Sequence, residues 1–228
     1  MKMARLLMSG ILFAQCMVVV AMQQEEDDTK HRLLFLHMDV SNLEPRHGSI
    51  LALAALLTNE KLNVQSELYE VIHNSYEVVT KIDPYLRQKY VASGLRQKVL
   101  NSEVSLKQVN DKLVSMLADK PNHVGMARLV GENSISLHHD FLKQKLPEVN
   151  RLISLKNHIH LPTLRASAFL FAEDDTFGSE KQNGESELKP QNSLEIVRSM
   201  LDEYKYYKTR YFTSIPEQTF HDIDLNDN

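Results

Sequence analysis

The stretch Leu95–Met116, LRQKVLNSEVSLKQVNDKLVSM, carries the most regular hydrophobic pattern in this chain. Its stripe steps by four and three residues, and charged and polar residues fill the remaining positions. That spacing is typical of a helix that packs lengthwise on another helix. We predict that it forms the inward face of an antiparallel bundle, and the alternative is a coiled coil between chains that would make a homo-oligomer. The members of this stripe are Leu95, Val99, Ser102, Leu106, Val109, Leu113 and Met116.

The composition of the whole chain also favours helices. Only 7 Gly and 7 Pro occur in 228 residues, which is few for a fold of many short strands and turns. Hydrophobic residues make up 43% and charged residues 25%, so the chain can bury a core and wholesale disorder is excluded. The sequence therefore predicts an all-α fold, an antiparallel helical bundle of five to seven helices without disulfides.

The N-terminus has the pattern of a secretory signal peptide. Lys2 and Arg5 supply the positive start, an apolar run without charges follows from Leu6 to Met22, and cleavage is expected after Ala21. The alternatives are a buried N-terminal helix and a retained membrane anchor. With residues 1–21 removed, Cys16 is lost and the mature chain has no cysteine, so it must be stabilised by its core or by assembly. We expect a secreted, extracellular protein with no membrane contact after cleavage.

Four regions follow along the chain. Residues 22–48 are expected to form an acidic N-terminal segment and lead-in, 49–213 the helical bundle domain, and 214–228 an acidic C-terminal tail. Within the bundle, residues 173–191 are rich in acidic side chains with interspersed Gly and Pro, and we predict a mobile acidic loop there.

Several apolar segments define the other expected helices. Ile50–Leu57 is apolar on every side and is predicted to be a central buried helix. Leu33–Leu36 is too short for its period to distinguish a helical turn from a strand. Pro147 must either kink the helix that contains it or begin a new one. Further helices are predicted within Asn59–Ile82, Val124–Val130, Leu137–Ile153, Leu164–Ala172 and Ser193–Phe212.

Motifs that carry chemistry are almost absent. The sequence contains no Gly-rich phosphate loop, no G-x-S-x-G nucleophile motif and no H-E-x-x-H zinc motif. Histidines cluster near the two ends of one predicted helix, but neighbouring side chains on a helix diverge, and the ends of a continuous helix would lie roughly 30 Å apart. We therefore interpret His138, His139, Asp140, His158 and His160 as surface or core residues and predict no metal site.

Two further clusters are also given a structural interpretation. Asp222, Asp224 and Asn226 match the start of a calcium loop, but the chain lacks the Gly and the final Glu of that motif. The aromatic and basic residues of 204–212 could bind nucleic acid, yet Tyr204, Tyr207 and Tyr211 share one helix face and are predicted to pack in the core. No catalytic, cofactor-binding or metal-ligating residue is predicted, and no cofactor.

Three classes of function remain. The first is a secreted, non-enzymatic protein that binds an unknown extracellular protein. The second is an extracellular carrier of an apolar small molecule, with a cavity lined by Ile50–Leu57 and Leu164–Ala172. The third is a hydrolase or metal enzyme, supported only by the histidines. We predict the first class, because catalytic motifs are lacking, residues 173–191 are expected to form an exposed mobile loop, and the chain is acidic. The net charge of −4 also argues against nucleic acid as a partner.

Overall fold

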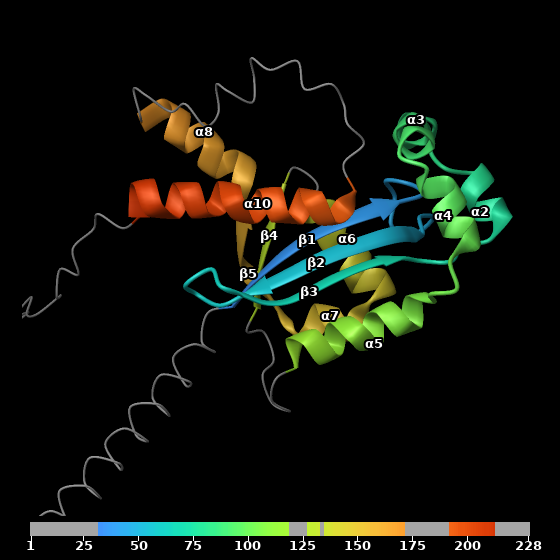
Figure 1. Ribbon diagram of the computed structural model, residues 1–228, viewed down its shortest axis with the longest axis horizontal. Helices are drawn as coiled ribbons and strands as arrows, with labels where there is room; N and C mark the ends of the chain where they lie inside the picture. Colours follow the sequence, from blue (N-terminus) through green and yellow to red (C-terminus); the bar gives the residue numbers. More distant parts are fainter. Residues whose placement is uncertain (1–31, 119–126, 133–134, 172–191, 213–228) are drawn as a thin grey trace, which may run out of the picture.

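The computed structural model describes residues 32–118, 127–132, 135–171 and 192–212. These residues form a mixed five-stranded sheet in the order β3-β2-β1-β4-β5 (Figure 1). β1 pairs antiparallel with β2 and parallel with β4; β2 pairs antiparallel with β3, and β4 pairs parallel with β5. The bounds of the strands are Arg32–Val40 for β1, Ile50–Thr58 for β2, Val64–Val71 for β3, Ala127–Gly131 for β4 and Ile153–His160 for β5.

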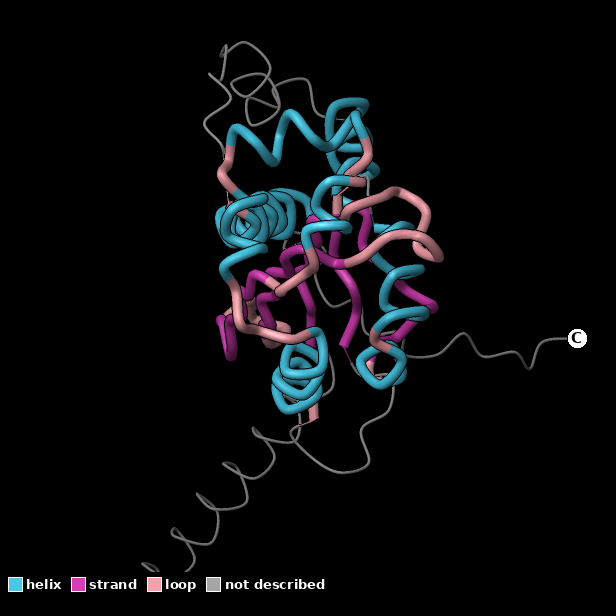
Figure 2. Tube along the Cα trace, turned by 90° about the vertical axis from the view of Figure 1, so that its right-hand side faces the viewer, coloured by secondary structure: helices cyan, strands magenta, loops and turns pink. Residues whose placement is uncertain are grey.

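Helices cover both faces of this sheet (Figure 2). α10 crosses one face with α8 nearby, α5, α6 and α7 pack on the other face, and α2, α3 and α4 gather where β1 ends (Figure 1). Their bounds are Tyr76–Thr80 for α2, Pro84–Ala92 for α3, Leu95–Asn101 for α4, Leu106–Leu117 for α5, Ile135–Lys145 for α6, Pro147–Arg151 for α7, Leu161–Phe171 for α8 and Ser193–Tyr207 for α10, which continues as the π-helix η1, Lys208–Phe212.

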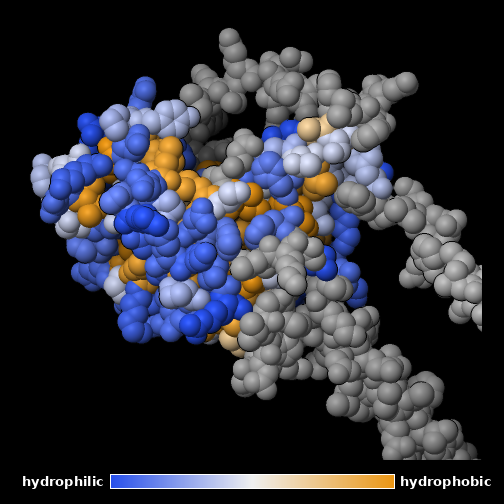
Figure 3. All heavy atoms as spheres, turned by 180° about the vertical axis from the view of Figure 1, so that it is seen from behind, coloured by the Kyte–Doolittle hydropathy of each residue, from blue (hydrophilic) through white to orange (hydrophobic). Residues whose placement is uncertain are grey.

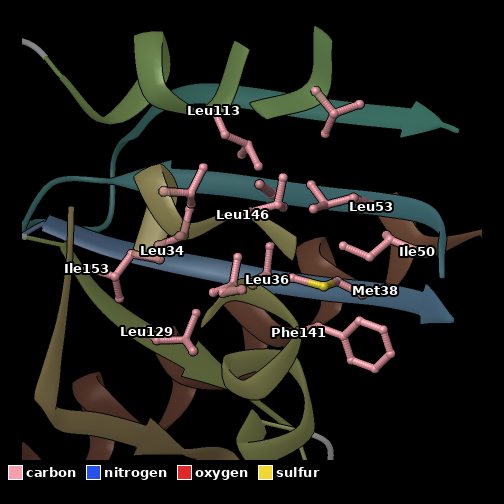
Figure 4. Packing of buried hydrophobic residues seen from close by; sticks show 14 of the residues in the cluster. Leu34, Leu36, Met38, Ile50, Leu53, Leu113, Leu129, Phe141, Leu146 and Ile153 are labelled. Carbon is pink, nitrogen blue, oxygen red and sulfur yellow. The ribbon is translucent and has the colours of Figure 1, made fainter. Parts of the chain in front are cut away.

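The two central strands are buried on both faces, and this explains why their sequence is apolar throughout. In β1, Leu34, Leu36 and Met38 point to the layer of α5, α6 and α7 (Figure 4). Leu33 and Phe35 point to α10. All nine residues of β2 are buried. Strands covered on both sides have near-continuous hydrophobic runs instead of alternating ones.

The prediction of an all-α helical bundle is therefore wrong. Ile50–Leu57, expected to be a buried helix, belongs to the central strand β2, because an apolar run suits a strand between two helical layers as well as a buried helix. The helices predicted within Asn59–Ile82 and Val124–Val130 are replaced in part by β3 and β4. β1 lies in the range 22–48 that was set apart as a lead-in.

The stripe of Leu95–Met116 is divided between two helices. α4 ends at Asn101, and α5 begins after Ser105, whose side chain forms a capping box with Gln108. Ser102, the polar member of the stripe, donates its hydroxyl to the carbonyl of Val71 at 2.6 Å, so it bonds β3 instead of continuing a helix. A continuous coiled coil is excluded, and the homo-oligomer through this stripe stays an untested prediction.

Of the two outcomes left open at Pro147, the structure shows a new helix, α7. The helix predicted within Ser193–Phe212 is present as α10, which begins after Asn192 in a capping box with Glu195. Tyr207 is buried, and Tyr204 packs edge-on against Phe35 with ring centroids 6.1 Å apart. The signal peptide 1–21, the loop 173–191 and the tail 214–228 lie outside the described residues.

The described surface is mixed in character. On the face seen from behind, hydrophilic side chains alternate with smaller hydrophobic areas (Figure 3). The large exposed hydrophobic side chains are spread over a loop, a strand and two helices, and they are Leu43, Val64, Tyr76, Tyr85 and Val91. Within the described part of the chain, no helix has both the length and the apolar character needed to span a membrane.

Replacing Leu113 of α5 tests the packing of this layer. Leu113 is fully buried against the sheet (Figure 4), so Leu113→Ala should lower the free energy of unfolding by about 2–5 kcal/mol. Lys107 on the same helix has a side chain 82% exposed, and Lys107→Ala should change it by less than about 0.5 kcal/mol. Denaturant titrations of both variants measure the difference, and equal small effects would contradict this packing.

Candidate active site

The carboxyl end of β1 presents a histidine and an aspartate on one side of the strand. His37 and Asp39 are two residues apart and therefore project to the same face, and the His37 Nε2 lies 3.7 Å from the Asp39 Oδ1. Both side chains are largely buried. Polar residues at alternate positions of a buried strand are costly unless they are paired, so their partners show what the site is built to do.

Asp39 is held by groups from three separate elements. The Nζ of Lys89, from α3, lies 3.0 Å from its Oδ1, and the hydroxyl of Ser193, at the start of α10, donates to its Oδ2. Burial acts to raise the pKa of Asp39, but His37, Lys89 and the Ser193 hydroxyl together lower it well below its usual range. Asp39 is therefore a carboxylate under all ordinary conditions.

Tyr90 fixes the end of β1 against α3. Its hydroxyl accepts from the backbone N–H of Val40 and donates to the carbonyl of the same residue, both at 3.1 Å. Burial, with the charge of Asp39, raises the pKa of Tyr90, which stays protonated and can donate. α3 itself begins at Pro84 after the cap Asp83, so the helix that carries Lys89 and Tyr90 starts at a fixed point.

Beside Asp39 lies a small polar pocket of about 130 Å³. It opens between β1, β3, α3, α4 and the start of α10, and two lysines contribute to its wall. The lining residues are Asp39, Tyr69, Lys89, Ser93, Leu95, Lys98, Asn192 and Ser193.

A second histidine, His138 of α6, lies behind this pair. It is 2% exposed, and its ring meets that of His37 edge-on with centroids 5.4 Å apart. The backbone N–H of Met38 donates to its Nε2 at 3.4 Å, so the neutral ring carries its proton on Nδ1. Burial and the charge of His37 lower the pKa of His138 to about 3, which makes it a neutral group.

The histidines singled out in the sequence are divided between two pairs. His138 turns to His37, whereas His139 lies beside His158 with ring centroids 5.4 Å apart, so the neighbouring side chains do diverge. The two ends of the region do not lie on one continuous helix, because the chain reverses at Pro147 through α7 and returns as β5, and only such a reversal could bring them together. His160 instead bonds the hydroxyl of Thr163 at 2.7 Å.

None of these clusters is built like a metal centre. In the described residues no group of three or more His, Cys, Asp or Glu side chains converges to hold an ion. The predicted absence of a metal and of cofactors stays a prediction, and the calcium-like Asp222, Asp224 and Asn226 lie outside the described residues.

Sequence reasoning missed His37, Asp39, Lys89 and Ser193. A signal for the first two was present, because they interrupt an otherwise apolar run at alternate positions, as polar residues on one face of a strand do. Lys89 and Ser193 lie 50 and 154 residues from Asp39, and only the fold brings them together.

Comparisons with known proteins find similarity to nucleases. No family model matches the chain. It is 24% identical over 182 residues to an oligoribonuclease of Marinobacter nauticus, covering 79% of this chain and 96% of the relative. It is 26% identical over 190 residues to an oligoribonuclease of Arabidopsis thaliana, covering 82% of each chain.

Among solved structures, the fold resembles exonuclease I. A product-bound exonuclease I superposes with a TM-score of 0.56 at 15% identity, and an E. coli exonuclease I with zinc ion and single-stranded DNA does so at 0.54 and 14%. This chain spans 44% and 41% of those two chains. The similarity establishes a mixed α/β fold of the exonuclease I kind.

These findings correct the functional predictions. The expectation of a secreted, non-enzymatic helical protein is wrong, since the relatives that match most of the chain are nucleases by name. The alternative of an apolar carrier fails with it, because Ile50–Leu57 is a strand in the core and does not line a cavity between helices. The localisation prediction, secreted and extracellular, is wrong on the same alignments, which join the chain to nucleases and not to secreted bundles.

The buried His138 should make stability depend on pH. Its pKa is about 3 in the folded protein and 6.5 as a free side chain, so only the unfolded state takes up a proton between these values. The free energy of unfolding should therefore fall as pH decreases from about 6.5 toward 4, by up to ~1.4 kcal/mol per pH unit. Protonation of Asp39 lowers the free energy of unfolding further only below about pH 3.8, the pKa of the free side chain.

Denaturant titrations across this pH range measure the slope. His138→Gln should flatten it whatever its effect on stability at neutral pH, and His47→Gln should leave it unchanged, because the side chain of His47 is 73% exposed. A slope that is the same in wild type and His138→Gln would show that His138 is not held neutral.

Proposed function

We propose that this protein is a nuclease that acts on short oligonucleotides at the Asp39 pocket. The observation that carries the proposal is the alignment with oligoribonucleases, which spans 79% of this chain and 96% of the relative from Marinobacter nauticus. An alignment of that extent covers the relative almost from end to end. The resemblance of the fold to exonuclease I supports the same class of reaction.

The side chains of the pocket suit a phosphodiester substrate. Lys89 and Lys98 place two ammonium groups in its wall, and lysine is a common partner of phosphate. Asp39 holds the Lys89 ammonium in this wall. The His37 imidazole lies on the same strand, with its Nε2 3.7 Å from the Asp39 Oδ1, which is beyond hydrogen-bond distance. The pocket therefore supplies positive charge for the phosphate.

The expectation that nucleic acid is not a partner came from the net charge of −4. That number averages over the whole chain, whereas binding depends on the charges at the site. Asp39 is the one carboxylate in the pocket wall and Lys89 and Lys98 are two cations, so the local balance is positive.

Nucleases commonly place two divalent ions on the scissile phosphate, and the zinc-bound exonuclease I shows that a metal can occupy a protein of this fold. Magnesium and manganese need several oxygen ligands, mostly carboxylates. In this pocket Asp39 is the only carboxylate, and both its oxygens already bond protein donors. The donor set does not fit such ions, and no step of the proposed reaction is assigned to them.

A cleavage assay with the purified full chain tests the proposal. End-labelled RNA of two to five nucleotides should be shortened, with DNA of the same sequence compared in parallel, with and without chelator. Asp39→Asn removes the carboxylate that positions Lys89 and should reduce the rate by about 10²-fold, the usual effect of misplacing a group that binds the substrate. Asp111→Asn removes an exposed carboxylate on α5 and should leave the rate unchanged.

Circular dichroism must show that Asp39→Asn retains the native fold. The proposal is overturned if the folded wild type releases no nucleotide from either substrate at any pH from mildly acidic to mildly basic, with chelator or with added magnesium, manganese or zinc. Equal rates in wild type and Asp39→Asn would support nuclease activity but contradict its assignment to this pocket.

A further inference from the structure

The ion pair of Lys89 and Asp39 joins a buried carboxylate to a half-exposed ammonium group. The side chain of Asp39 is 8% exposed and that of Lys89 is 50% exposed, with 3.0 Å between Nζ and Oδ1. A buried carboxylate without a positive partner would cost several kcal/mol, so the site needs a cation at this point. Lys89 supplies it from within the chain.

The remaining positions around the carboxylate are also taken by protein groups. Ser193 donates to Oδ2, and His37 stands 3.7 Å from Oδ1 on the strand side. The three neighbours come from α10, β1 and α3, so they surround Asp39 from different directions. A divalent ion would have to displace Lys89 or Ser193 in order to reach it.

The electrostatics of the pocket also oppose a second cation. Lys98 lies in the same wall as Lys89, and no second carboxylate lines the cavity. The described residues contain no cluster of three potential metal ligands anywhere, this pocket included. A divalent ion would meet two positive side chains and one carboxylate that is already neutralised.

Lys89 lines the pocket and keeps N–H donors that its bond to Asp39 does not use. An ammonium group has three donors, and the bond to Asp39 uses one of them. Its Nζ also lies 5.6 Å from the ring centroid of Tyr90, and this ring and Asp39 hold the ammonium in place. A positioned ammonium with unused donors is suited to donate to a phosphate oxygen.

We infer that the Lys89 ammonium takes, in this site, the place that a divalent cation would occupy. The pocket then receives the phosphate of a nucleotide through Lys89 and does not bind magnesium or manganese. The part that concerns nucleotides rests on the proposed function, whereas the part that concerns metals rests only on the ion pair.

Two titrations of the full-length protein without nucleic acid substrate test this inference. In the first, millimolar Mn²⁺ is followed by calorimetry and by the paramagnetic signal of the free ion, and wild type should show no binding that depends on Asp39. In the second, adenosine 5′-monophosphate should bind wild type, and Lys89→Ala should weaken that binding by about tenfold or more, the loss expected for one charge-assisted hydrogen bond.

Lys81→Ala is the matched control for the charge that is removed. Lys81 also pairs with a carboxylate, Glu77, but both side chains are exposed and lie outside the pocket. It should bind the nucleotide as wild type does. The thermal unfolding midpoint of each variant shows that a loss of binding is not a loss of fold.

The inference is overturned if wild type binds Mn²⁺ and Asp39→Asn abolishes that binding. It is also overturned if Lys89→Ala and Lys81→Ala bind the nucleotide with equal affinity, or if wild type does not bind it. These outcomes are separate from those of the cleavage assay. Cleavage that requires added metal would support the nuclease function and contradict the inference about Lys89. Nucleotide binding without cleavage would support the inference about Lys89 and contradict the nuclease function.

Discussion

The structure depends on burying β1 and β2 on both faces. Each side chain of β1 must enter one of two helical layers, so the direction and register of this strand determine which residues meet α10 and which meet α5, α6 and α7. That constraint also determines where the polar residues at its end are placed. His37 and Asp39 follow Leu33 and Phe35 in the alternation, and Asp39 lines the pocket at the start of α10. The strand cannot slip by one residue without burying both polar side chains among the leucines.

The sequence predicted the amphipathic helices better than it predicted the class of fold. The regular stripe of α5 and the interruption at Pro147 depend on local chemistry, and local chemistry can be read from neighbouring residues. The sheet could not be read in this way, because ILALAALLT is apolar at every position and has no period. The low Gly and Pro content also favoured the wrong fold class, because a sheet with helical crossovers needs fewer tight turns than a barrel of short strands.

The candidate site shows the same limit. The alternation of His37 and Asp39 was visible in the sequence, but its meaning depends on Lys89 and Ser193, which approach only when the sheet and helices are assembled. The histidines that attracted attention as a cluster were separated by the reversal of the chain at α7 into one buried pair and one more exposed pair. Sequence reasoning also showed no sign of the similarity to oligoribonucleases and exonuclease I, which the comparisons found.

Asp39 also has a consequence for the order in which the chain folds. Its hydrogen-bond partners Lys89 and Ser193 are 50 and 154 residues away, and the contact with Ser193 closes one of the longest loops in the described structure. The entropy lost on closing a loop grows with its length, so the contact with Ser193 is the more costly of the two to form. Until α3 and α10 have docked, β1 presents a carboxylate without its ammonium and hydroxyl partners.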